Sequence, residues 1–206
     1  MKKNRIITVV LVIVAFIVGF FVGDNSAVNR INKLDNNKQL TQQTNSTPTT
    51  ESQENKTKSK ICKKGEESSC GDFNLKILDA NETTTVEAGN KSDNKTTNEK
   101  FIVCKVSIKN ISKQPKQYKS TDFILGNMKD KAQYTINDAA FSAMSSANGK
   151  ETIYNKNNNF VGVYKDINPN TTKQTYLIFE VPKDFNISDG VLISGGSGET
   201  TAFYLK

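Results

Sequence analysis

The sequence contains no histidine and no tryptophan, and it has only three cysteines and four prolines among 206 residues. Without histidine, the most common metal ligand and a frequent general base are both missing. The three dispersed cysteines, Cys62, Cys70 and Cys104, do not form a zinc-binding pattern. Without histidine, nucleophilic catalysis would need a serine–lysine pair or a pair of acidic residues, and no such pair has a distinctive spacing in this sequence. The composition therefore predicts a protein that is not an enzyme and that uses no metal or cofactor.

Arginine is scarce, although the formal net charge is +7. Its only occurrences, Arg5 and Arg30, lie in the N-terminal part of the chain. A nucleic-acid-binding domain concentrates positive charge on one face, usually with arginine among the contacts. Here the lysines are spread along the chain among 21 acidic residues. We therefore expect no nucleic-acid partner.

The longest apolar run covers residues 6–22 and carries no charge. A helix over this run would span roughly 25 Å, close to the hydrocarbon core of about 30 Å. It has no polar stripe of the kind that a helix at the surface of a soluble domain shows. Lys2, Lys3 and Arg5 precede it and favour a cytoplasmic N-terminus. The sequence therefore predicts a single-pass anchor in residues 1–23, with the rest of the chain outside the cytoplasm.

The alternative is a cleaved signal peptide and a secreted protein. Cleavage requires small residues after the apolar core, and the triplet Asn25, Ser26 and Ala27 fits this requirement poorly. No cysteine follows the run at the position where bacterial lipoproteins are processed. These two observations favour a retained anchor over removal.

Residues 24–70 are rich in Asn, Gln, Thr, Ser and Lys, and they contain no aromatic residue. Such a segment buries too little apolar surface to offset its chain entropy, so it is expected to be a disordered or extended stalk. Val28, Ile31 and Leu34 could prolong the membrane helix, or they could form a short parallel coiled coil.

Two disulfide pairings are considered for the three cysteines, because an exported protein can form disulfides. Cys62 and Cys70 would close a short loop at the start of the domain, and this is the favoured pair. A bond between Cys70 and Cys104 is the alternative, because spacing does not fix connectivity. Cys104 falls on the apolar face of an expected strand, where a free cysteine acts as a small core residue.

Residues 71–206 change to a period of two, which is typical of half-buried strands. Phe73, Leu75 and Ile77 alternate with polar residues. The strongest strand covers residues 101–109, where four apolar side chains point one way and lysines point the other. Further strands are expected at residues 83–88, 123–125, 133–136, 160–164, 175–181, 191–194 and 201–205.

Residues 138–149 have the only helical features in this region. Asp138 can cap the N-terminus, Ala140, Met144 and Ala147 recur at helical spacing, and Gly149 can end the helix. Short strands with breakers between them, and a single short helix or turn, favour an all-β fold. The sequence predicts an antiparallel two-sheet sandwich of immunoglobulin type.

Several segments occur in an order that resembles a known family. They are residues 100–110 (KFIVCKVSIKN), Asp122 with Phe123, Tyr134, residues 167–170 (INPN) and residues 177–182 (LIFEVP). The chain from about Gly71 to Lys206 resembles the immunoglobulin-like domain of unknown function 4352, which is common in exported and membrane-linked proteins of Gram-positive bacteria. That family in turn resembles small secreted mycobacterial antigens. The resemblance implies an immunoglobulin-like sandwich in a cell-envelope protein.

Two departures from the family pattern carry information. The family usually has Pro-Gly where this chain has Pro169 and Asn170. Asn is the next best residue after Gly for positive φ at the third position of a turn, so the turn is expected to survive. The family usually carries Val where this chain has Cys104, which supports a packing role for this thiol.

Candidate contact residues come from the loops. Tyr118, Tyr134 and Tyr154 lie near turns, where tyrosine can be an exposed binding contact, although a place in or at the edge of the core is the favoured interpretation. Four acidic residues could meet around calcium, but no spaced calcium loop supports this; they are Asp122, Asp130, Asp138 and Glu151. The glycine-rich residues 194–198 are expected to be a hairpin turn, because a phosphate loop would need a following Lys and a helix.

The favoured function is that of a membrane-anchored, extracytoplasmic, immunoglobulin-like module. It would bind an envelope component or a protein partner without catalysing a reaction. The alternatives are an extracellular enzyme or enzyme inhibitor, and a structural or redox-buffering surface protein.

Overall fold

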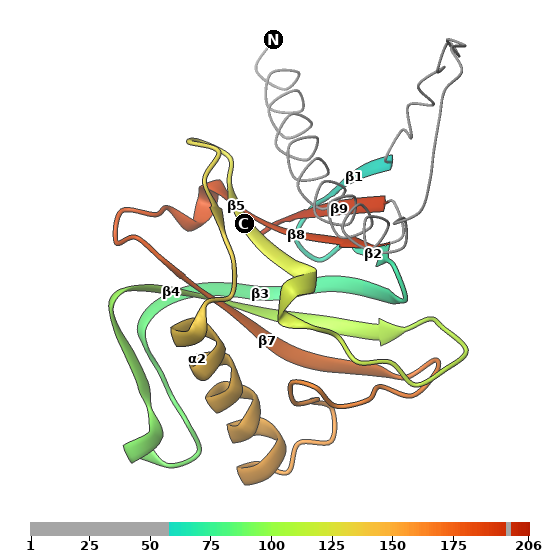
Figure 1. The fold of residues 1–206 in the computed structure, drawn as a ribbon, viewed down its shortest axis with the longest axis horizontal. Helices are drawn as coiled ribbons and strands as arrows, with labels where there is room; N and C mark the ends of the chain where they lie inside the picture. The colour runs from blue at the N-terminus through green and yellow to red at the C-terminus, as the bar shows by residue number, and fades with distance from the viewer. Residues whose placement is uncertain (1–57, 197–198) are drawn as a thin grey trace, which may run out of the picture.

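Two β-sheets pack face to face in the computed structural model, which describes residues 58–196 and 199–206 (Figure 1). One sheet has the strand order β1-β9-β8-β5-β6, and the other has the order β2-β3-β4-β7. The strands of the first sheet are β1 (Lys58–Cys62), β9 (Glu199–Tyr204), β8 (Gly190–Gly196), β5 (Phe123–Asn127) and β6 (Gln133–Tyr134). Those of the second are β2 (Glu67–Cys70), β3 (Phe73–Val86), β4 (Lys95–Asn110) and β7 (Thr172–Val181). The two-sheet sandwich is therefore confirmed.

The predicted anchor at residues 6–22 and most of the predicted stalk lie outside the described residues. Within residues 58–196 and 199–206, no helix is long and apolar enough to cross a membrane.

Strand β4 forms the centre of the second sheet, between β3 and β7. The predicted strand at residues 101–109 lies within it, and Ile102, Cys104, Val106 and Ile108 are all fully buried. Cys104 pairs with Ala80 on β3 and Leu177 on β7, in the middle of this ladder. It is a free thiol, and burial raises its pKa to about 12. The predicted packing role of Cys104 is confirmed.

A β-bulge in β3 changes which side chains face outward. Before it, Leu75 and Ile77 point into the sandwich; the register then shifts between Ile77 and Asp79, so that Ala80 becomes the next buried residue. A bulge adds one residue to one strand and reverses the alternation beyond it. Asp79 and Asn81 therefore project from the outer face of the sheet.

The helix α2 (Asp138–Gly149) lies against this outer face and makes a third layer (Figure 1). Its predicted range is confirmed, but the capping residue is Asn137, whose side chain accepts a hydrogen bond from the Ala140 N–H. Small buried residues, Ala140, Ala143 and Ala147, allow the helix to approach the sheet closely. Gly149 does not end the helical path, because a π-helix, η3 (Lys150–Tyr154), continues it. Three short 3₁₀ helices complete the described elements: η1 (Lys91–Asp93), η2 (Ser120–Asp122) and η4 (Ile187–Asp189).

Strands β1 and β2 lie in residues that the composition assigns to the stalk. Strand β2 pairs with β3, and β1 pairs with β9 in parallel, which departs from the all-antiparallel expectation. The sheets thus begin before Gly71. These strands are short and mostly polar; in β2 only Ser68 and Cys70 face inward. Their place comes from pairing with stronger strands, which local patterning does not reveal.

The predicted strand at residues 160–164 does not form. Only a bridge between Phe160 and Gln174 is present, and Tyr164 has a left-handed φ of 58°. The chain here covers the outer edge of β7 instead. The Gln174 N–H donates to the Asn159 carbonyl over 2.7 Å, and the Val161 N–H donates to the Gln174 carbonyl over 2.9 Å.

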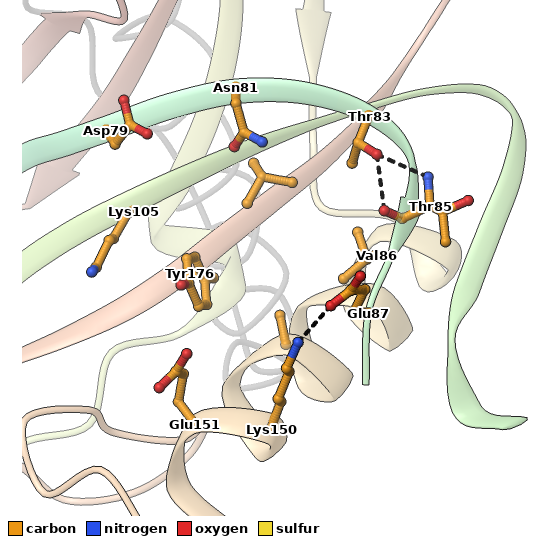
Figure 2. Close-up of a pocket in the computed structure, with 12 residues that line it drawn as sticks. Asp79, Asn81, Thr83, Thr85, Val86, Glu87, Lys105, Lys150, Glu151 and Tyr176 are labelled. Carbon is orange, nitrogen blue, oxygen red and sulfur yellow. Dashed lines mark hydrogen bonds and ion pairs between the residues drawn. The ribbon is translucent and has the colours of Figure 1, made fainter. Parts of the chain in front are cut away.

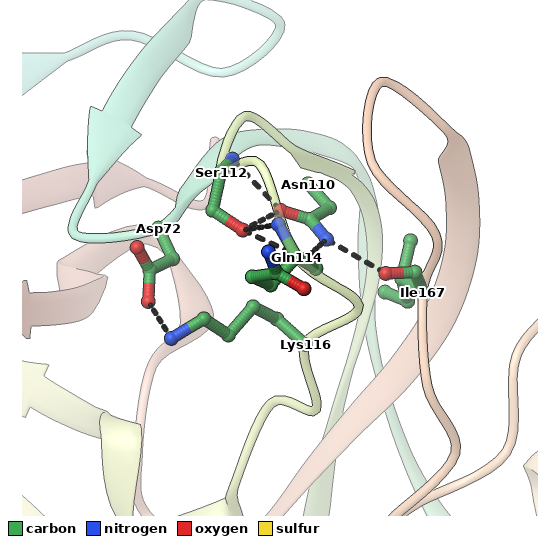
Figure 3. Close-up of polar contacts among 6 residues, drawn as sticks. All are labelled: Asp72, Asn110, Ser112, Gln114, Lys116 and Ile167. Atoms are coloured by element: carbon green, nitrogen blue, oxygen red, sulfur yellow. Dashed lines mark hydrogen bonds and ion pairs between the residues drawn. The ribbon is translucent and has the colours of Figure 1, made fainter.

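The predicted turn at Pro169 and Asn170 is confirmed: Asn170 has a φ of 58°, and the Thr171 N–H donates to the Asn168 carbonyl over 3.1 Å. Buried Asn110 holds this region to the end of β4 (Figure 3). Its Nδ2 donates to the Ile167 and Gln114 carbonyls, each over 2.7 Å, while its Oδ1 accepts from the N–H and hydroxyl of Ser112. One amide thus fixes two loops.

The raised pKa of Cys104 gives an alkaline test of the core. A thiol whose folded pKa lies near 12, above its ordinary value of 9.0, adds stability below pH 9 that is lost as pH rises towards 12. At pH 11 the wild type should lose about 2–3 kcal/mol from this thiol. We expect Cys104→Val to have near wild-type stability at pH 7 and to be more stable than the wild type at pH 11. Urea unfolding at both pH values measures the two stabilities. If the difference in unfolding free energy between the wild type and Cys104→Val were the same at pH 7 and pH 11, the expectation would be contradicted.

Candidate binding groove

A groove of about 590 Å³ lies between the end of α2 and the outer face of β3, β4 and β7 (Figure 2). Its floor is a cross-strand row, because Asp79 on β3 pairs with Lys105 on β4, which pairs with Tyr176 on β7. A second row brings Asn81 beside Val103. The floor therefore offers an aromatic ring, an amide and charges of both signs.

The wall of the groove comes from the junction of α2 with η3. Lys150 and Glu151 project there, and the Lys150 Nζ lies 2.6 Å from the Glu87 Oε2, in the segment that follows β3 (Figure 2). This ion pair joins the helix layer to the sheet layer across one end of the groove. Hydrogen bonding from Lys150 lowers the pKa of Glu87 below its ordinary value.

Asn148 fixes α2 to the sheet beneath the groove. Its Oδ1 accepts from the Tyr176 N–H over 2.9 Å, and its Nδ2 donates to the Tyr176 carbonyl over 2.9 Å. Both backbone groups belong to the edge of β7 that faces away from β4. The Asn148 amide thus occupies the place of a neighbouring strand, and it is 1% exposed. Because Lys150 and Glu151 follow at once, this contact also positions the groove wall.

The charged groups of the groove have partners within the protein. Asp79 forms an ion pair with Lys64 at 3.0 Å, and hydrogen bonding from Lys64 lowers the pKa of the Asp79 carboxyl. The Lys105 Nζ lies 5.3 Å from the centroid of the Phe160 ring. The Glu151 Oε2 accepts from the Asn157 side chain over 3.1 Å. A ligand therefore need not bring a compensating charge.

The shifted pKa values in the groove do not favour proton transfer. Those of Asp79 and Glu87 are lowered, whereas that of Tyr176 is raised, chiefly by burial and then by Glu151. A general acid or base works best with a pKa near the operating pH. Here the carboxylates remain ionised and the phenol remains protonated at neutral pH. These groups are arranged to donate and accept hydrogen bonds.

Of the three predicted tyrosine contacts, Tyr154 is exposed, with 56% of its surface accessible. It belongs to η3, as Lys150 does, and its ring lies against Gly89. A Cβ at residue 89 would fall 2.0 Å from the ring, so this close approach requires glycine. Tyr134 is half-buried and packs edge-on against Phe185, with the ring centroids 5.6 Å apart.

Tyr118 is fully buried, so the core interpretation holds there and Tyr118 is not an exposed contact. Its ring packs edge-on against Phe123, and its hydroxyl lies 2.6 Å from the Thr175 Oγ1. This hydrogen bond satisfies the phenol inside the core, which a position near a turn does not indicate. Burial raises the pKa of Tyr118 to about 12.

Cys62 and Cys70 are buried free thiols in the structure, and burial raises the pKa of Cys70 to about 11. Their pairing stays a prediction. The acidic residues considered for calcium do not gather: in the described part of the chain, no group of three or more Asp, Glu, Cys or His side chains could hold a metal ion. Two of them cap local turns, where Asp122 accepts from the Lys119 N–H and Asp130 accepts from the Ala132 N–H.

Residues 62–189 match the model of the family described as Domain of unknown function (DUF4352), which is more than half of the chain. The chain belongs to the DUF4352 family. This confirms the resemblance found in the sequence, and every residue that lines the groove lies within the matched stretch. A search of curated proteins finds no match.

Solved structures similar to this DUF4352 chain include three bacterial proteins. One is an uncharacterized beta-sandwich protein from Clostridium difficile, with 18% identity, a TM-score of 0.47, and coverage of 78% of this chain and 100% of that one. A conserved hypothetical protein from Bacillus anthracis has 16% identity, a TM-score of 0.45, and coverage of 63% and 84%. The yjhA protein from Bacillus subtilis has 14% identity, a TM-score of 0.42, and coverage of 65% and 81%.

The groove residues carry little signal in the sequence. The alternation of β4 places Lys105 outside the core, where solvation is the default interpretation. Its position beside Asp79 and Tyr176 depends on the bulge in β3 and on the register of three strands. Asn148 lies in a predicted helix, but nothing local indicates that its amide meets a strand edge.

Asn148→Asp tests the contact that holds the groove wall. The variant loses the bond to the Tyr176 carbonyl and places a carboxylate there, so we expect a loss of about 2–4 kcal/mol at pH 7. Burial raises the pKa of such a carboxyl group, so the loss should shrink as pH falls and the group is protonated. The exposed Asn155→Asp is the matched control, with an expected change within about 0.5 kcal/mol. Urea unfolding at pH 7 and pH 5 measures both; equal losses for the two variants would contradict the assignment.

Proposed function

We propose that this protein is a non-enzymatic binding module of the bacterial cell envelope. Its immunoglobulin-like sandwich is held at the membrane by residues 6–22, and its groove binds a neutral, hydroxyl-rich ligand of the glycan class. The groove between α2 and the outer face of the β3–β4–β7 sheet is the observation that carries the proposal.

The ligand class follows from the charges and the hydrogen-bonding groups of the groove. Ion pairs hold Asp79 and Glu87, as described above. The uncharged polar groups that remain include the Asn81 amide and the Tyr176 hydroxyl. Amide and hydroxyl groups both donate and accept hydrogen bonds, which suits a chain of sugar hydroxyls.

The ring of Tyr176 adds an apolar surface to these polar groups. It packs against Phe160 with the centroids 5.2 Å apart, so the ring is held in place before a ligand arrives. Ligand sites commonly combine an apolar lining with a few fixed polar groups. An aromatic ring and an amide that line the same groove fit the mixed surface of a sugar ring, which has apolar C–H faces and polar edges.

An extracellular enzyme is the alternative function. The lowered carboxyl pKa values of Asp79 and Glu87 and the raised pKa of Tyr176 support binding over proton transfer. The absence of histidine from the whole sequence supports the same choice.

The membrane anchor is supported by the uncharged run at residues 6–22 and the basic residues before it. Protease treatment of intact protoplasts tests this topology. Without protease, we expect the protein to be recovered in the membrane fraction. With protease added outside the protoplasts, we expect the domain to be digested. A full-length protein that is protected from protease, or recovered in the medium, would contradict it.

The groove is tested with an N-acetylglucosamine tetramer as the glycan probe, using nuclear magnetic resonance of the full chain in detergent micelles. Backbone signals of the groove floor on β3, β4 and β7 should shift as the probe is added. Asn81→Ala should weaken binding by about tenfold, since a lost hydrogen bond of 1.4 kcal/mol corresponds to that factor.

The exposed Asn158→Ala, outside the groove, is the matched control and should bind as the wild type does. Shifts confined to other surfaces, or equal affinities for the two variants, would remove the groove as the glycan site.

A further inference from the structure

Three lysines lie together on the outer face of the β2–β3–β4–β7 sheet. Lys105 and Lys109 are on β4, and Lys76 on β3 pairs with Ser107, which lies between them. All three point outward, because their neighbours along the strands, such as Val106, point into the sandwich. Diagonal neighbours on adjacent antiparallel strands are about 7–8 Å apart, so Lys76 lies at that distance from each of the other two. We call these three residues the lysine strip.

The lysine strip has no carboxylate partner in the described part of the chain. None of its three amines forms an ion pair there. The registers place two carboxylates beside the strip, and both are bound elsewhere. The Glu67 Oε1 accepts from the Asn74 Nδ2 over 2.8 Å, and the Asp79 Oδ1 lies 3.0 Å from the Lys64 Nζ. Since like charges at this spacing repel one another, the strip favours an anion that lies across all three lysines.

The lysine strip begins where the groove ends. Lys105 belongs to both, and Figure 2 shows its amine at the opposite end of the groove from the pair of Lys150 with Glu87. The Lys105 Nζ lies 5.3 Å from the centroid of the Phe160 ring, a contact that supplies no counter-charge. A ligand on the strip can therefore lie end to end with a ligand in the groove.

Uncharged hydrogen-bonding side chains surround the lysines on the same outer face. They are Asn74, Ser107 and Gln174. Amide and hydroxyl groups donate and accept hydrogen bonds, which suits the hydroxyls of a polyol. Between Lys76 and Lys109 the described face carries no aromatic ring on which a nucleic-acid base could stack. The strip therefore favours a polyol chain over a single-stranded nucleic acid.

The shape of this face favours a thin chain over a lipid surface. The helix α2 lies on the same outer face, and a helix with its side chains is about 10 Å across. It therefore stands above the strip and holds a flat bilayer away from the lysines. A glycerol phosphate repeat has as many backbone bonds as two amino-acid residues, so its extended length is roughly 7 Å. This length matches the spacing of the lysines along the strip.

We infer that the lysine strip binds a chain of polyol units joined by phosphodiester groups. Successive phosphates lie beside Lys105, Lys76 and Lys109, and the polyol hydroxyls meet the amides and hydroxyls between them. Lysine binds phosphate as a point charge, and each phosphodiester carries one negative charge. The inference goes beyond the neutral glycan proposed for the groove, and it depends neither on that ligand nor on the membrane anchor.

Fluorescence anisotropy of a labelled glycerol phosphate decamer tests the inference, with the full chain in micelles of a polyoxyethylene detergent. The double variant Lys76→Gln/Lys109→Gln should bind about tenfold more weakly than the wild type, because each exposed charge pair contributes a few-fold to affinity. Neither residue lines the groove. Raising the salt from about 50 mM to about 200 mM should weaken wild-type binding by roughly tenfold, and binding of the double variant by less.

The matched control is Lys129→Gln/Lys183→Gln, which removes the same charge from exposed lysines outside the strip and should bind as the wild type does. Lys76→Arg/Lys109→Arg keeps both charges and should bind within about twofold of the wild type, which separates lost charge from lost folding. Absence of decamer binding, or equal weakening by the strip and control variants, would overturn the inference.

Two competitors distinguish the sources of a phosphodiester group. An oligothymidine decamer presents it on a nucleic acid, and phosphatidylglycerol added to the micelles presents it on a lipid surface. At equal phosphate concentration, unlabelled glycerol phosphate decamer should displace the labelled one, and each competitor should displace it several-fold less well. Displacement by either competitor as effective as that by the unlabelled decamer would overturn the assignment to a polyol phosphate chain.

Discussion

The side-chain amide of Asn148 completes the edge of β7, and the third layer of the molecule depends on this contact. A strand edge presents unpaired backbone groups that must find partners. On β7 the loop at residues 159–161 covers Gln174, and Asn148 covers Tyr176. Since Asn148 belongs to α2, satisfying the edge also fixes the helix. Lys150 and Glu151 are then carried to the rim of the groove.

The groove and the apolar cluster around Ile193 (Ile124, Val191, Ile193 and Ala202) lie on opposite outer faces of the sandwich. The outer face of β3, β4 and β7 is polar, and the carboxylates Asp79 and Glu87 of its groove are paired within the protein. The outer face of β8 and β9 is apolar and buried. The two outer faces of the sandwich therefore differ in polarity.

The sequence predicts those elements whose cause is local. The strand at residues 101–109, the helix at residues 138–149 and the Asn170 turn follow from periodicity and from backbone preferences, and each is confirmed. Prediction from the sequence fails for elements whose structure is decided by contacts between segments distant in the chain. Strands β1 and β2 are polar, residues 160–164 cover an edge without joining the sheet, and Tyr118 is buried by a bond to Thr175. The groove depends on the bulge in β3 and on the β3–β4 and β4–β7 registers, and none of these features can be recognised from the local sequence.

The exchange of the Tyr176 backbone N–H in the full chain tests the role of Asn148 most directly. Hydrogen–deuterium exchange followed by nuclear magnetic resonance resolves this proton from its neighbours. The contact with Asn148 should protect it as strongly as the amides of β4, because opening then requires α2 to leave the sheet. Exchange as fast as that of an unpaired edge amide would show that Asn148 does not complete β7, and the groove would lose its fixed wall.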